Sequence, residues 1–187
     1  MKSEKRKLAV LFPGIGYTCD KPLLYYSSKL AVKLDYAVMP VPYGHFPKGV
    51  KGDAGKMQES FLLAMEQAQD ILKEVEWGSF QDIVFISKSI GTVVSSCYAK
   101  NKGLAVRSIL LTPVEETFRY TQSPAIAFHG TADPWADTGK IVSSCKDAGI
   151  PLFLTENANH SLETGDLKTD LDTMAKTMER IRDFLMS

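Results

Sequence analysis

The sequence is poor in the residues that build metal sites and disulfide frameworks. Its three cysteines, Cys19, Cys97 and Cys145, are odd in number, lie far apart and form no C-x-x-C pair. Its three histidines are also scattered, with no H-x-x-x-H spacing and no His/Cys cluster. We therefore expect no metal, no cofactor and no disulfide framework.

Excess charge of one sign and long apolar runs are also missing. Lys plus Arg and Asp plus Glu balance at 22 each, so nothing draws the chain to nucleic acid or to an anionic membrane surface. The first apolar run, Leu8 to Phe12, is cut by Pro13-Gly14 and is too short for a secretory signal or a membrane span. We expect a cytoplasmic protein without a nucleic-acid or membrane partner. Its oligomeric state is left open.

What the sequence does contain is a regular alternation of short apolar runs and longer helical patterns. Its 187 residues suffice for one domain, residues 1–187. Six apolar runs are predicted as strands: 8–12, 36–41, 83–86, 106–111, 125–128 and 152–154. Helical patterns separate most of them, at 22–34, 57–75, 90–100 and 137–148, and a last one follows at 167–185. The prediction is an α/β fold: a three-layer sandwich with a mostly parallel sheet and helices on both faces.

The third strand runs straight into a serine-centred turn. The segment Ser87-Lys88-Ser89-Ile90-Gly91 fits a small-x-Ser-x-Gly turn between a strand and a helix, which exposes a serine nucleophile at its apex. The residues two before and two after the apex approach closely and must be small, as Ser87 and Gly91 are. The alternative is that both serines are ordinary polar residues that end a strand.

An acid and a base follow later in the chain. Asp133 lies in His129-Gly130-Thr131-Ala132-Asp133-Pro134, just past the fifth strand, where a carboxylate can orient a histidine. His160 lies in the polar loop after the sixth strand, and this loop should reach the same sheet edge as Ser89. The alternatives are a turn-forming aspartate and a surface histidine. We assign His129 a structural role and Asp137 a role at the start of a helix.

Two backbone N–H groups could stabilise an oxyanion. Ile90 directly follows the apex serine at a helix N-terminus, and Ile15 lies in the loop Pro13-Gly14-Ile15-Gly16-Tyr17 after the first strand. The competing interpretation of this G-x-G is a dinucleotide fingerprint, but its third glycine is missing. Candidates for substrate contact are Tyr17, Lys88 and Trp135; the alternative is that the aromatics anchor loops and that the lysine is solvated.

These motifs together resemble the α/β-hydrolase superfamily, specifically its small, lidless, bacterial-type members. The resemblance spans nearly the whole chain and rests on P-G-I-G-Y (13–17), S-K-S-I-G (87–91), H-G-T-A-D-P (129–134) and N-H-S (159–161). It implies a nucleophile elbow at Ser89, a catalytic triad completed by Asp133 and His160 in the chain order of that superfamily, and an oxyanion hole of Ile15 and Ile90.

The chain departs from the superfamily pattern in three places. Ser87 replaces the first elbow glycine, Pro13 stands where many members have histidine, and the first two strands of the full fold are missing. The stretch 112–123, where larger members insert a lid, is short, so we expect no lid insertion and an open site.

The expected function is that of a serine hydrolase, a carboxylesterase or thioesterase that cleaves a small-molecule ester or thioester through an acyl-Ser89 intermediate. Two alternatives stay open. One is a catalytically inert binding protein on the same fold. The other is a hydrolase that acts on a peptide or carbon–carbon bond.

Overall fold

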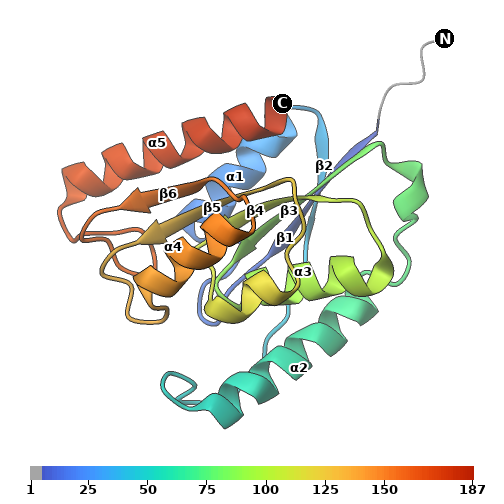
Figure 1. Cartoon of the computed structure of the whole chain (residues 1–187). Helices are drawn as coiled ribbons and strands as arrows, with labels where there is room; N and C mark the ends of the chain where they lie inside the picture. Colours follow the sequence, from blue (N-terminus) through green and yellow to red (C-terminus); the bar gives the residue numbers. More distant parts are fainter. Residues whose placement is uncertain (1–5) are drawn as a thin grey trace.

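The computed structural model describes residues 6–187 and contains one six-stranded sheet in the order β2-β1-β3-β4-β5-β6 (Figure 1). Every neighbouring pair of strands is parallel. The strands are β1 (Lys7–Phe12), β2 (Tyr36–Pro40), β3 (Asp82–Lys88), β4 (Arg107–Leu111), β5 (Ala125–Gly130) and β6 (Leu152–Thr155). The α/β class and the parallel sheet are thus confirmed. Residues 1–5, the start of the expected domain, lie outside the described part.

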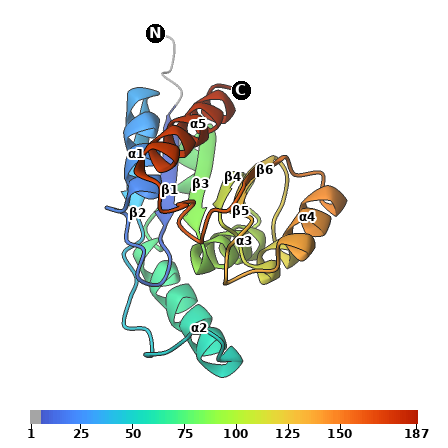
Figure 2. The ribbon, with the colours of Figure 1, turned by 90° about the vertical axis from the view of Figure 1, so that its left-hand side faces the viewer.

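Helices cover both faces of the sheet (Figures 1 and 2). They are α1 (Pro22–Lys33), α2 (Ala54–Ile71), α3 (Ile90–Lys102), α4 (Thr138–Asp147) and α5 (Leu167–Met186), with two short 3₁₀ helices, η1 (Trp77–Ser79) and η2 (Glu115–Arg119). α1 and α5 pack on one face, and α2, α3 and α4 on the other. Within residues 6–187, no helix combines the length and the apolar character needed to cross a bilayer.

The central strands are buried on both faces, as continuous apolar sequence predicts for a parallel sheet. Alternate side chains of β1 and β3 enter the two cores: Val10 and Phe85 face α2 and α3, whereas Leu11 and Ile86 face α1 and α5. This packing fixes the strand ends, so the loops that leave their carboxyl ends meet at one edge of the sheet.

Helix α2 begins three residues earlier and ends four residues earlier than the predicted 57–75. It begins early because the side chain of Asp53 accepts a hydrogen bond from the backbone N–H of Lys56, which caps the first turn. The loop before α2 is therefore shorter at its end than expected, since it stops at Asp53 and not at Lys56.

Two glycines let separate loops pack against each other at this edge. A Cβ at Gly91 would lie 2.3 Å from the carbonyl oxygen of Phe12 and 2.6 Å from that of Pro13. A Cβ at Gly130 would lie 2.3 Å from the carbonyl oxygen of Ala158. Only glycine permits these approaches, which bring the start of α3 against the β1 loop and the end of β5 against the loop after β6.

Gly91→Ala should therefore lower the free energy of unfolding by about 3 kcal/mol, the cost of forcing an extra carbon into packed backbone. Gly78→Ala is the matched control, because a Cβ at the exposed Gly78 meets nothing within 4 Å. Urea denaturation of both variants measures the difference. Equal stability of the two would show that the loops do not pack as described.

Candidate active site

Ser89 stands at the apex of the turn between β3 and α3 in a strained backbone conformation, with φ 56° and ψ −125°. A non-glycine residue with positive φ costs free energy, and such strain is common at functional positions. The surrounding chain holds it: the N–H of Ser89 donates to the carbonyl of Leu111, and the N–H of Thr92 donates back to the carbonyl of Ser89. The sequence motif thus forms a sharp strand-to-helix turn.

Ser87 occupies the first small position of this turn without exposing its side chain. It is fully buried, and its hydroxyl donates to the carbonyl of Ile109 on the neighbouring β4 at 3.2 Å. The hydroxymethyl group fits because its polar atom finds an acceptor in the sheet. This serine is therefore part of the strand packing, and Ser89 is the one that faces the cavity.

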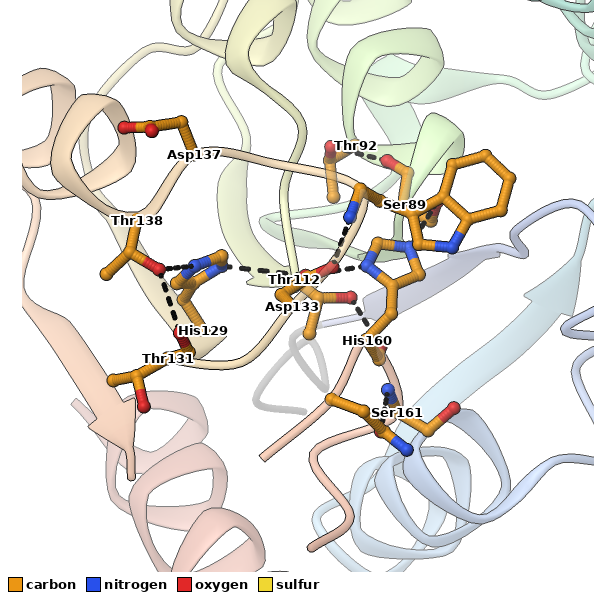
Figure 3. A network of polar contacts seen from close by, with 12 residues as sticks. Ser89, Thr92, Thr112, His129, Thr131, Asp133, Asp137, Thr138, His160 and Ser161 are labelled. Atoms are coloured by element: carbon orange, nitrogen blue, oxygen red, sulfur yellow. Dashed lines mark hydrogen bonds and ion pairs between the residues drawn. The ribbon is translucent and has the colours of Figure 1, made fainter. Parts of the chain in front are cut away.

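His160 lies beside Ser89, with its Nε2 2.7 Å from the Oγ of Ser89 (Figure 3). A hydrogen bond from the next strand end holds the loop of His160 in place, since the hydroxyl of Thr112, directly after β4, donates to the carbonyl of His160 at 3.0 Å. The loop also turns on itself, because the side chain of Asn159 accepts from the N–H of Ser161. The imidazole is thus held within hydrogen-bond reach of the serine hydroxyl.

Asp133 completes the line of polar contacts. Its Oδ2 lies 2.7 Å from the Nδ1 of His160, and its Oδ1 accepts from the backbone N–H of Trp135 at 2.9 Å. Its side chain is fully buried. The tautomer that this arrangement favours has its proton on Nδ1, donated to Asp133, and leaves Nε2 free to accept from Ser89.

A second histidine approaches the same carboxylate. The Nδ1 of His129 lies 3.7 Å from Asp133 Oδ2, and its Nε2 is 2.9 Å from the hydroxyl of Thr138 at the start of α4 (Figure 3). Burial is the main cause that lowers the pKa of His129, so its ring is neutral near neutral pH. Asp137 caps α4 by accepting from the N–H of Lys140, as the sequence predicts.

The electrostatics leave His160 neutral and Asp133 ionised. Burial lowers the pKa of His160; the hydrogen bond to Asp133 raises it and the charge of Lys88 lowers it, and the net result lies below the ordinary value. For Asp133, burial acts to raise the pKa, but hydrogen bonds from His160 and the N–H of Trp135 outweigh it, so the pKa is lowered. A neutral imidazole beside an ionised carboxylate can act as a base near neutral pH.

A cavity of about 210 Å³ opens over Ser89. Its lining comprises Ile15, Gly16, Tyr17, Met57, Lys88, Ser89, Ile90, Val114, Trp135, His160 and Ser161. A larger groove of about 670 Å³ lies between β6 and α5, but it contains none of these residues and none of the perturbed titratable groups described above. The smaller cavity is therefore the candidate active site.

All the sequence candidates for substrate contact and oxyanion binding line this cavity. Trp135 stacks on His160, with ring centroids 5.6 Å apart, and Lys88 lies against the ring of Tyr17. Ile15 and Ile90 line the cavity together with Ser89, and Ile90 is the first residue of α3. The structure thus brings Ser89, Asp133, His160 and these candidates to one place.

Three residues that line the cavity were not site candidates from the sequence: Met57, Val114 and Ser161. Met57 reaches the cavity because α2 begins early, so the first turn of that helix lies at the sheet edge. Val114 precedes η2, and Ser161 directly follows His160. Only the position of Ser161 beside His160 could have been recognised from the sequence.

Comparison with known proteins supports the fold. No family model matches the sequence, and no curated protein matches it either. Among solved structures, Est1E from Butyrivibrio proteoclasticus with ferulic acid bound superimposes with a TM-score of 0.70 at 13% identity, covering 99% of this chain and 90% of that one.

Two further structures agree. A serine hydrolase homologue from Coxiella burnetii gives a TM-score of 0.64 at 17% identity, covering 98% of this chain and 86% of that one. Esterase 2 of Thermogutta terrifontis gives a TM-score of 0.63 at 18% identity, covering 98% of this chain and 84% of that one. The resemblance noted from the sequence is confirmed at the level of fold: this chain has the α/β-hydrolase fold.

Proposed function

We propose that the protein is a serine hydrolase that cleaves a small ester or thioester. The observation that carries this proposal is the continuous line of contacts from Ser89 through His160 to Asp133, with both heavy-atom distances 2.7 Å. Nucleophile, base and orienting acid within hydrogen-bond reach form the geometry of the Ser-His-Asp triad. The esterases among the structural neighbours support the same choice.

In the proposed reaction, the hydroxyl oxygen of Ser89 attacks the substrate carbonyl while Nε2 of His160 takes the hydroxyl proton. Asp133 stabilises the resulting imidazolium through Nδ1. The oxyanion of the tetrahedral intermediate accepts hydrogen bonds from the N–H groups of Ile15 and Ile90. The carbon–oxygen or carbon–sulfur bond then breaks, and His160 protonates the departing alcohol or thiol.

The same groups then hydrolyse the acyl-Ser89 ester, with water in the place of the serine hydroxyl. His160, neutral again, takes a proton from water as the water oxygen attacks the acyl carbon. Collapse of the second tetrahedral intermediate breaks the bond to Ser89, which recovers its proton from His160 and releases the carboxylic acid. Apart from the buried Asp133, every residue that takes part in either half lines the cavity.

The segment between β4 and β5 supports an open, lidless site within a single domain. It contains only the one-turn η2, so no inserted helical unit covers the cavity from this side. The rim is instead completed by Met57 of α2, which is half-buried. We therefore propose activity on dissolved substrates, without interfacial activation.

The size of the cavity predicts a preference for short acyl groups. At about 210 Å³ it lies below the ~300 Å³ at which drug-sized ligand pockets begin. Among p-nitrophenyl esters, acetyl and butyryl should be hydrolysed with kcat/KM at least about tenfold above octanoyl, because a longer chain loses its apolar contacts outside the cavity. Acetyl-CoA and octanoyl-CoA extend the comparison to thioesters.

A rate that rises steadily with chain length would contradict the small-substrate part of the proposal. Labelling of Ser89 by a fluorophosphonate without turnover of any ester or thioester would indicate a hydrolase that cleaves another bond, such as a peptide bond. Absence of both turnover and labelling would support the inert binding protein instead.

A further inference from the structure

Lys88 is a buried cation with no polar partner. Its side chain is fully buried, and its Nζ makes no hydrogen bond with any residue in the range 6–187. An ammonium group carries three donors, and burying it without an acceptor is strongly unfavourable. Such a group in a native protein calls for an explanation, and a bound ligand or a catalytic role is one of those that apply to a group at a cavity.

The ring of Tyr17 contacts the Lys88 ammonium without satisfying its hydrogen bonds. Nζ lies 4.9 Å from the ring centroid of Tyr17, a cation–π contact that leaves the N–H groups unused. The hydroxyl of Tyr17 is turned to the backbone N–H of Leu23, from which it accepts at 3.0 Å. It makes no hydrogen bond with the Nζ of Lys88.

Asp133, the acid whose charge acts on Lys88, makes its hydrogen bonds with other groups. One of its oxygens accepts from His160 and the other from the N–H of Trp135, and the carboxylate acts on Lys88 only through its charge. Burial lowers the pKa of Lys88 to about 7, while the charge of Asp133 acts to raise it. A second negative charge next to Nζ would therefore favour its protonated form.

Lys88 also lines the same cavity as Ser89, together with Tyr17 and Trp135. A further cation lies near the cavity-lining Trp135, since the Nζ of Lys51 is 5.7 Å from the centroid of its ring. Each of the two cavity-lining aromatic residues, Tyr17 and Trp135, thus has a lysine ammonium near its ring. One ammonium in a cavity of this size matches a single negative charge.

From this arrangement we infer that the substrate is an ester or thioester that carries a carboxylate, and that this carboxylate accepts hydrogen bonds from the ammonium of Lys88 while Ser89 attacks the carbonyl. The inference rests on the proposed hydrolase function and assigns its substrate class. Lys88 would then be a specificity residue, because a neutral substrate leaves its ammonium unpaired in the cavity.

The test compares each anionic ester with a neutral partner of similar shape. Monoethyl glutarate is paired with ethyl pentanoate, which places the carboxylate on the acyl side; 4-carboxyphenyl butyrate is paired with phenyl butyrate, which places it on the leaving group. With the wild-type protein near neutral pH, kcat/KM for the anionic member of at least one pair should exceed that of the neutral member by about tenfold or more. The pair that shows the preference identifies the side of the scissile bond that Lys88 contacts.

Lys88→Met removes the charge and keeps the length of the side chain. It should lower the ratio of kcat/KM for the anionic over the neutral member by at least about 30-fold, the effect of removing one partner of a buried charge pair. Lys146→Met is the matched control, because Lys146 is exposed at the far end of α4, and it should leave the ratio unchanged. Thermal melting establishes that both variants are folded.

Other outcomes separate this inference from the proposed function. Hydrolysis of neutral esters without any preference for anionic ones in the wild type would overturn the inference and leave the hydrolase proposal standing. An equal loss of kcat/KM for both members of a pair in Lys88→Met would also overturn the inference. It would show that Lys88 acts only through the effect of its charge on His160. No hydrolysis of any of the four esters would count against both.

Discussion

Ser89→Ala should lower kcat/KM for any ester substrate by on the order of 10⁵-fold, because the variant has no oxygen to form the acyl intermediate. The fold should be unaffected, since within residues 6–187 the Ser89 side chain bonds only to His160, and the elbow is held by backbone contacts to Leu111 and Thr92. Steady-state hydrolysis of p-nitrophenyl acetate measures the loss.

Ser87→Ala is the matched control for this variant. Both serines belong to the same turn, but Ser87 faces the sheet and donates to the carbonyl of Ile109. Losing that bond costs about 1 kcal/mol of stability and removes nothing from the cavity. Equal losses of activity in the two variants would contradict the assignment of Ser89 as the nucleophile.

The second large effect is expected for Asp133→Asn, with kcat lowered by on the order of 10⁴-fold. The amide has nearly the same shape as the carboxylate, so the loop should keep its structure. Its NH₂ group, however, would donate to Nδ1 of His160 and favour the tautomer with the proton on Nε2. That tautomer cannot accept the proton of Ser89.

Asp137→Asn provides the comparison, because Asp137 lies four residues further on and caps α4 from outside the cavity. Asparagine caps helices about as well as aspartate, so both activity and stability should stay near those of the wild type. If Asp133→Asn retained activity within about tenfold of the wild type, another group would have to orient His160.

The sequence predicted the fold well because strong local signals agree with one another. Each apolar run is followed by a turn or a helix start, and parallel connection of such units leaves few arrangements. The same logic placed Ser89, Asp133 and His160 at one sheet edge, since all three follow strand ends. Their actual contact distances depend on packing, such as the close approach at Gly130, which no local pattern encodes.

What the sequence missed depends on the burial of individual side chains. Lysine is usually exposed, so the complete burial of Lys88, at the end of β3 and against Tyr17, could not be predicted from its neighbours in the chain. The early start of α2 follows from the cap at Asp53, and with it the position of Met57 at the cavity. Both features shape the substrate site, which is where sequence reasoning was least informative.

The most direct test of the central claim is to map the residue that a fluorophosphonate modifies. The reagent forms a covalent bond with an activated serine oxygen, and mass spectrometry of the digested protein locates it. We predict a single adduct on Ser89, absent from Ser89→Ala and present in Ser87→Ala. Undiminished labelling of Ser89→Ala, or an adduct mapped to another serine such as Ser161, would contradict the account.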